Sequence, residues 1–440
     1  MKQIRIQSIF KPLATITLIM LLAAGCGSGK SPAKPAELVV WKVFEDTSHF
    51  QPLLSAFQKK YPNVRVTFVE KNVVGYEEEL INALASGQGP DIFSINDAWL
   101  PKYIDKITPA TEKQWTFADY KNTFVDAAVN DFTKDRVIYG AATYVDSLAL
   151  YYNKDLLGSS GIATPPKTWD ELARDSQRLA RQNQTGYFSR SGLTAGLSSS
   201  APGGQINRSE DVLYLLMLQK GVVPWSSDGT QPTFGQAVVD NKGRQVEAAQ
   251  EALQYYTSFA NPNSPNYTWN TRSDYSIDAF ANTRAAFMIN YSYARDLVQS
   301  KAANLNYDVA PMPQPNLDDP QVNFANYWGE VVSKQSKHPT EAWNFLKTIT
   351  GKEALDKYYA GHKVPSSRKD LIDLQASDPD IGVFAEGNLT AKTFYRPDQG
   401  KFDAIMAKTI DNVTLRGWQV DQAILDAQTQ ASALATPRRN

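Results

Sequence analysis

The sequence predicts an α/β fold in which two lobes, each a sheet covered by helices, are joined by segments that cross between them. The N-terminal part alternates strands and helices in the rhythm of a doubly wound sheet. Residues 148–152 form a strand that is apolar on both faces, which is typical of a sheet covered on both sides. A polar and aromatic segment, residues 143–146, precedes this strand, as expected where a chain passes between lobes. The length of 440 residues suggests about two to three domains.

The first lobe begins with a strand at residues 37–44, where apolar residues dominate before two carboxylates. Helical spacing of apolar residues follows at 50–61, and an alternating pattern at 64–69 indicates a second strand. An amphipathic helix at 76–85 leads to a short third strand at 91–96. Because these elements alternate, we expect the three strands to be parallel.

The rest of the chain continues with helices and buried strands. A capping pattern at Thr168 and Glu171 begins a helix. The further expected elements are helices at 211–220, 245–259 and 404–430, a buried strand at 284–291 and a second crossing segment at 326–332.

The first residues have the pattern of an export signal. Three basic residues precede an apolar run at 13–22 that is too short to span a membrane, and small residues then lead to Cys26. This arrangement resembles a bacterial lipobox, in which the cysteine becomes the lipidated first residue of the mature protein. We therefore expect a signal peptide at 1–25, lipidation of Cys26 and a flexible leash at 26–36.

The charge and the reactive residues exclude several functions. With 45 basic and 46 acidic residues, the chain has no basic footprint for nucleic acid and no polybasic membrane patch. Cys26 is the single cysteine, and His49, His338 and His362 lie apart in the sequence without the spacing of metal ligands. The sequence therefore predicts no metal, no cofactor and no enzymatic activity.

The ends of the first and third strands carry candidate binding residues. They are Phe44, Glu45 and Asp46 after the first strand, and Asn96, Asp97 and Trp99 after the third. Ligands of such sheets bind beyond the carboxyl ends of the strands. Carboxylates and amides bind sugar hydroxyls and aromatic rings stack on sugar faces, so this combination favours a carbohydrate.

Several stretches also resemble the extracellular solute-binding proteins of family 1, the sugar-binding lipoproteins of bacterial ABC importers related to maltose-binding protein. The matching stretches lie, in family order, at 85–92, 138–156, 165–172, 284–290 and 333–346. The resemblance implies a type II periplasmic-binding-protein-like fold with hinged lobes and a cleft between them. It implies lobe 1 at 37–144 and 328–374, and lobe 2 at 145–327 and 375–436.

The same resemblance implies further ligand-binding residues and partners. Added to the strand-end residues above, the implied positions are Tyr144, Asp146, Glu210, Tyr291, Tyr293, Trp328, Gly329, Glu330, Tyr395 and Arg396. Tyr293 stands where a tryptophan is usual, which makes that stacking surface smaller. The resemblance implies a carbohydrate ligand, with an oligosaccharide favoured, and the permease subunits of an ABC importer as partners. We expect a monomer that is lipid-anchored on the extracytoplasmic face of the cell membrane and binds no nucleic acid.

Other functions stay open at this stage. A polyamine would suit the acidic residues Glu45, Asp46, Asp97, Asp146 and Glu330. A peptide or an anion would fit the same fold. A surface glycosidase would use two of the carboxylates as acid and base. A protein of this kind that reports to a membrane sensor would have the same sequence features.

Overall fold

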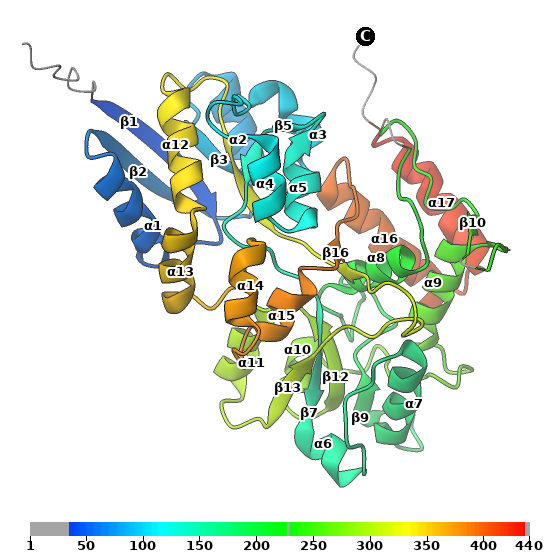
Figure 1. Cartoon of the computed structure of the whole chain (residues 1–440). Helices are drawn as coiled ribbons and strands as arrows, with labels where there is room; N and C mark the ends of the chain where they lie inside the picture. Colours follow the sequence, from blue (N-terminus) through cyan, green and yellow to red (C-terminus); the bar gives the residue numbers. More distant parts are fainter. Residues whose placement is uncertain (1–34, 227–228, 241, 436–440) are drawn as a thin grey trace, which may run out of the picture. The chain divides into compact units, whose positions relative to one another are not determined.

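A computed structural model describes residues 35–226, 229–240 and 242–435 (Figure 1). From Ala36 onward, the described residues belong to one compact unit. The predicted signal peptide, Cys26 and most of the predicted leash lie outside the described residues. Within the described part, no helix is long and apolar enough to cross a membrane.

The first sheet has five strands in the order β2-β1-β3-β15-β6. Their bounds are β1 (Ala36–Val43), β2 (Val64–Lys71), β3 (Ile92–Asn96), β6 (Gly140–Ala141) and β15 (Trp328–Val332). As predicted, β1 is parallel to both β2 and β3. β15 arrives from much later in the chain and is antiparallel to β3 and β6. It brings Trp328 opposite Asn96, at the carboxyl end of β3.

Helices from both ends of the chain cover this sheet. Those before β6 are α1 (Thr47–Lys60), α2 (Tyr76–Ala85), α3 (Leu100–Tyr103), η1 (Ile104–Lys106), α4 (Phe117–Thr123) and α5 (Asp126–Phe132), with the hairpin of β4 (Thr133–Lys134) and β5 (Val137–Ile138). After β15 follow α12 (Pro339–Ile349), α13 (Lys352–Gly361) and α14 (Lys369–Gln375). α12 and α13 pack on α1 (Figure 1), and Phe57 of α1 meets Phe345 of α12 in one buried core.

The second sheet has the order β13-β7-β12-β9-β8. Its strands are β7 (Ala149–Asn153), β8 (Arg181–Gln182), β9 (Phe188–Leu193), β12 (Ala285–Asn290) and β13 (Tyr307–Ala310). β7 lies between β13 and β12 and is antiparallel to both. Leu150 and Tyr151, on opposite faces of β7, are both fully buried, so this strand is apolar on both faces as predicted.

The second sheet has its own core. Its helices are α6 (Lys154–Ser159), α7 (Trp169–Leu179), α8 (Ser209–Gln219), α9 (Ala248–Ser258), α10 (Ser276–Ala281), α11 (Ala294–Lys301), α15 (Gly382–Gly387), α16 (Gln399–Thr414) and α17 (Val420–Ser432). β10 (Val238–Val239) pairs with β11 (Gln245–Val246), so the helix predicted at 245–259 begins only at Ala248. We call each sheet with its helices and core a lobe.

Three segments connect the two lobes. The first runs from β6 to β7, and its Val145 carbonyl accepts a hydrogen bond from Asn388 (2.6 Å). The second leads from β14 (Asn323–Phe324) to β15. The third passes through β16 (Ala391–Lys392), which pairs with β14. Ala391 belongs to the first core, and Phe394, three residues later, belongs to the second. The residue patterns predict the first two, and the resemblance implies a third crossing between residues 374 and 375.

The third connection lies later than the boundary expected between residues 374 and 375. That boundary falls at the end of α14, whose Leu371 and Ile372 belong to the first core. Between α14 and β16 the chain contacts both lobes: Phe384 of α15 packs in the core around Tyr151 of β7, whereas Ala385 and Ala391 belong to the first core.

Candidate functional site

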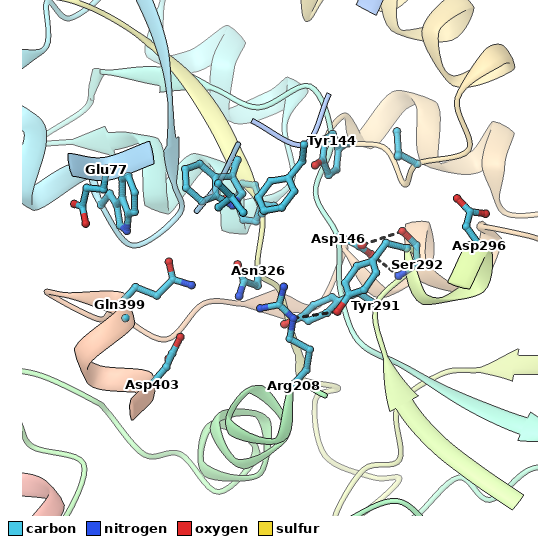
Figure 2. A pocket seen from close by; sticks show the side chains of 18 of the residues that line it. Glu77, Tyr144, Asp146, Arg208, Tyr291, Ser292, Asp296, Asn326, Gln399 and Asp403 are labelled. Atoms are coloured by element: carbon cyan, nitrogen blue, oxygen red, sulfur yellow. Dashed lines mark hydrogen bonds between the residues drawn. The ribbon is translucent and has the colours of Figure 1, made fainter. Parts of the chain in front are cut away.

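A cavity of about 930 Å³ receives side chains from both lobes. Figure 2 shows Tyr144 and Glu77 on one side of it, and Tyr291, Ser292 and Arg208 on the other. Seven of the residues singled out in the sequence line this cavity: Phe44, Trp99, Tyr144, Asp146, Tyr291, Tyr293 and Trp328. The ends of β1, β3, β12 and β15 therefore meet at one place.

Aromatic rings form the wall that the first lobe contributes. The ring of Trp328 lies 4.9 Å from that of Trp99 and 5.8 Å from that of Phe44, edge to face in both pairs. Phe44 has a positive φ of 58° and is 55% exposed. A non-glycine residue rarely adopts this backbone conformation, and such strain concentrates at functional sites. Trp328 and Phe44 thus present apolar rings to the cavity.

The second lobe contributes two tyrosines and an arginine. The rings of Tyr291 and Tyr293 stack 6.2 Å apart, and the Arg208 guanidinium carbon lies 5.7 Å from each ring centre. Arg208 Nε donates to the Tyr293 hydroxyl (3.1 Å), which donates to Asn207 Oδ1 (2.7 Å). The Tyr291 hydroxyl donates to Asp211 Oδ2 (2.8 Å). These bonds fix the rings, so the second wall is also aromatic but carries a cation.

Asp146 lies in the first connection between the lobes and is buried. Its carboxylate accepts hydrogen bonds from the backbone nitrogen (3.1 Å) and the hydroxyl (2.8 Å) of Ser292, drawn as dashed lines in Figure 2. Burial raises the pKa of Asp146 to about 7, although both hydrogen bonds from Ser292 favour the charged form. Asp146 thus ties the connection to the turn after β12.

We expect the stability that Asp146 provides to depend on pH. Because its folded pKa is raised to about 7, its contribution is full below the unfolded value of about 4 and is lost as the pH rises through 7. The free energy of unfolding of the native protein, measured relative to Asp146→Asn, should therefore fall by about 2–3 kcal/mol between pH 5 and pH 8. Urea unfolding of both proteins across this range measures the difference. A difference that stays constant would show that Asp146 remains charged.

The other predicted residues at the end of β1 do not line the cavity. Glu45 turns into the first lobe, where the Tyr358 hydroxyl donates to its Oε2 (2.6 Å). Asp46 caps α1 by accepting from the His49 backbone nitrogen (2.9 Å). Asn96, at the end of β3, donates to Asn326 Oδ1 (3.0 Å) and so holds the second connection in place. Each of these three side chains thus forms a hydrogen bond within the protein, and none of the three lines the cavity.

Two neighbours of Trp328 in β15 also have structural partners. Glu330 accepts from Lys42 Nζ (2.5 Å), and both side chains are buried in the sheet. Gly329 lies against Phe132: a Cβ added there would be 2.4 Å from Phe132 Cζ. Only a residue without a side chain leaves room for that ring.

Glu210 is buried in the first turn of α8 and accepts from the backbone nitrogen (3.2 Å) and hydroxyl (2.9 Å) of Ser199. Burial raises the pKa of Glu210 to about 7. Tyr395 contacts the ring of Trp225 at 5.9 Å. Glu210 and Tyr395 both lie in the second lobe, and neither lines the cavity.

Arg396 and Asp97 belong to a buried ion network that joins the lobes. The Arg396 guanidinium lies 3.6 Å from Asp97 of the first lobe, and 3.7 Å from Asp211 and 3.4 Å from Asp403 of the second. Arg396 is fully buried, and burial raises the pKa of Asp97 to about 7. Asp403 also lines the cavity, so this ion network extends from the buried Arg396 to the cavity wall.

Sequence reasoning missed several residues that line the cavity. Arg208 follows a Gly- and Ser-rich loop and carries no motif, and its cavity position depends on the left-handed turn (φ 62°) that begins α8. Glu77 and Glu78 read as the charged first turn of α2. Gln399 begins α16, which the sequence indicated only as a closing helix. Asn326 also lines the cavity, and its position two residues before Trp328 could have identified it as a candidate.

Two histidines that lie apart in the sequence are adjacent in the structure. The rings of His49 and His362 stack with centres 4.5 Å apart, and His362 Nε2 lies 3.7 Å from Glu45 Oε1. His362 also lines the cavity, and burial lowers its pKa to about 4. The packing of α13 on α1 brings these groups together, so sequence spacing was an insufficient reason to set the histidines aside.

Comparisons with known proteins bear on this arrangement. A family model for bacterial extracellular solute-binding proteins matches residues 41–356. Maltodextrin-binding protein MdxE of Bacillus subtilis (strain 168) is 26% identical over 346 residues, which cover 77% of this chain and 75% of that protein. The arabinooligosaccharide-binding protein of the same strain is 23% identical over 368 residues, covering 78% and 76%.

A solved structure gives the same fold. The cyclic alpha-maltosyl-1,6-maltose binding protein from Arthrobacter globiformis matches with a TM-score of 0.74 at 17% identity, covering 91% of this chain and 99% of that one. The predicted two-lobed, type II periplasmic-binding-protein-like fold is thereby confirmed. Together with the family match over most of its length, this establishes that the chain belongs to the bacterial extracellular solute-binding proteins.

Proposed function

We propose that this protein captures a carbohydrate outside the cell and delivers it to the permease of an ABC importer. The observation that carries the proposal is the pair of facing aromatic walls, with Trp328 and Phe44 in one lobe and Tyr291 and Tyr293 in the other. Rings of this kind stack on sugar faces, and the polar groups between them suit hydroxyls. The relatives named after maltodextrin and arabinooligosaccharide support the same class of ligand.

The size of the cavity favours an oligosaccharide. Small-molecule pockets span about 300–1,000 Å³, and the volume of about 930 Å³ lies near the upper end. Ligand bound between the lobes would contact both walls only when they approach each other. The difference in its affinity for the two states would then supply the free energy of hinge closure, and the permease would recognise the closed form.

The proposal includes no enzymatic step, and two of the carboxylates that a glycosidase could have used are paired with cations. Glu330 is paired with Lys42, and Asp97 lies beside Arg396. Of the five acidic residues that would suit a polyamine, only Asp146 lines the cavity. Other carboxylates line it as well, namely Glu77, Glu78, Asp296, Asp398 and Asp403, so polyamines form the contrasting panel in the test below.

We further propose that the protein is a monomer anchored by a lipid at Cys26 to the extracytoplasmic face of the cell membrane, and that it binds no nucleic acid. The apolar run before Cys26 and the balanced charge support these points. Capture near the membrane would keep the loaded protein close to its permease.

Titration of the compact unit from Ala36 onward tests the ligand class. Mono- and oligosaccharides are added while tryptophan emission and melting temperature are followed, with polyamines as the contrasting panel. Because Trp99 and Trp328 line the cavity, an oligosaccharide should shift the emission, and binding to the folded state should raise the melting temperature. A response to polyamines alone would contradict the proposal, and consumption of the sugar would reveal an enzyme.

A further inference from the structure

A cluster of metal-ligating side chains lies beside the cavity, where the turn after β1 meets the end of α13. It consists of Glu45, His49 and His362, and one ligand atom from each lies within 4.8 Å of those of the other two. His49 stands in the first turn of α1, and His362 directly follows α13. Two imidazoles and a carboxylate are a ligand set that suits Zn²⁺.

The carboxylate of Glu45 is the strongest indication that the cluster takes a ligand. Its side chain is 1% exposed. Oε2 accepts from the Tyr358 hydroxyl, whereas Oε1 is buried and has no hydrogen-bond partner among the described residues. A buried carboxylate oxygen is normally paired or coordinates a metal. Here the unpaired oxygen lies 3.7 Å from His362 Nε2, on the side where the histidines stand.

A second carboxylate, Asp46, lies beside the ring of His49. Its Nδ1 lies 3.0 Å from Asp46 Oδ2, so this nitrogen has a carboxylate partner and Nε2 is left to bind. Carboxylate–histidine pairs of this kind fix the ring and its tautomer at metal sites. Tyr358 plays the corresponding part for Glu45. The cluster therefore has the right ligand types, and two of its three members have a hydrogen-bonding or charged partner of their own.

We propose that Glu45, His49 and His362 form a Zn²⁺ site. In a tetrahedral site with bonds of about 2.0–2.2 Å, ligand atoms lie about 3.3–3.6 Å apart. The three groups therefore need to draw closer than they now are, and one of the two stacked imidazoles needs to turn so that both point at the same ion. His49 can supply this movement, because its side chain is 47% exposed. His362 lines the cavity, and a fourth coordination position would be open to water or to a donor atom in the cavity. The site goes beyond the proposed carbohydrate binding and does not depend on it.

Calorimetric titration of Zn²⁺ into the compact unit from Ala36 onward, stripped of metal and of any affinity tag, tests the proposal. We expect one Zn²⁺ per chain, at least tenfold weaker binding in both His49→Gln and His362→Gln, and much weaker binding of Mg²⁺, which prefers oxygen ligands. His338→Gln is the matched control, since His338 precedes α12 and lies outside the cluster. It should bind Zn²⁺ like the native protein.

The exposure of His49 keeps the experiment interpretable, because its replacement removes a ligand without opening the core. Melting temperatures measured without metal should be the same for His49→Gln and the native protein. Absence of one-to-one binding, equal affinity for Mg²⁺, or unchanged affinity in both cluster variants would overturn the proposal. If the native protein bound Zn²⁺ but none of the sugars, that result would contradict only the proposed function.

Discussion

Replacing Arg396 with methionine is expected to lower the free energy of unfolding by about 3–5 kcal/mol. Arg396 is fully buried, and its guanidinium is the cation nearest to Asp97, Asp211 and Asp403 in their shared network. Methionine is also long and unbranched but leaves Asp97 and Asp403 without this cation in a low dielectric. Asp211, in contrast, keeps Arg208 at 3.9 Å. Removing one partner of a buried pair is costly. Urea unfolding followed by tryptophan emission measures the change.

Arg244→Met provides the matched control. Arg244 forms an ion pair with Asp240 (2.7 Å), but its side chain is 67% exposed, and exposed pairs contribute about 0–1 kcal/mol. The difference between the two variants isolates the effect of burial. If Arg396→Met lost less than about 1 kcal/mol, the carboxyl groups must take up protons in place of the cation, which is the neutral form that burial already favours for Asp97.

Replacing Trp328 with alanine is expected to weaken oligosaccharide binding at least about thirtyfold, a loss of about 2 kcal/mol. Trp328 stands at the centre of the aromatic wall, with Phe44, Trp99 and Tyr76 around it at ring distances of 4.9–6.0 Å. Its removal takes away a stacking surface and leaves Phe44 without its neighbour. The dissociation constant from fluorescence or calorimetric titration gives the result.

Trp418→Ala serves as the control, since Trp418 is half-buried and lies outside the cavity lining. Its affinity for the same sugar should equal that of the native protein. An unchanged affinity in Trp328→Ala, with the melting temperature still raised by sugar, would place the ligand elsewhere and contradict the proposed site.

Much of the fold could be predicted because it depends on local pattern. The alternation of β1, α1, β2, α2 and β3 follows from periodicity and turn residues, and the structure has each of these elements close to its expected bounds. The burial of β7 on both faces was likewise apparent from its apolar residues. A third connection was expected only from the resemblance, between residues 374 and 375, and β16 was not identified because it has two residues and no pattern of its own.

The candidate site was likewise predictable only in part. Adjacent residues at a strand end turn to different sides, so Phe44 reaches the cavity while Glu45 turns into the lobe. In β15, Trp328 and Glu330 share a face, but Glu330 lies deeper in the sheet and pairs with Lys42. The sequence indicates which strand ends carry polar and aromatic residues, but it does not indicate how deep each side chain lies.

By itself, the sequence determined the α/β architecture, the strand ends that gather, and the aromatic residues Trp99 and Trp328 at those ends, since each follows from residues close together in the chain. The tertiary structure alone decided that Arg396 joins three carboxylates and that His362 lies beside His49. Both contacts require helices or connections distant in sequence to pack together. Packing of that kind depends on the shape and burial of whole surfaces, which no local spacing records.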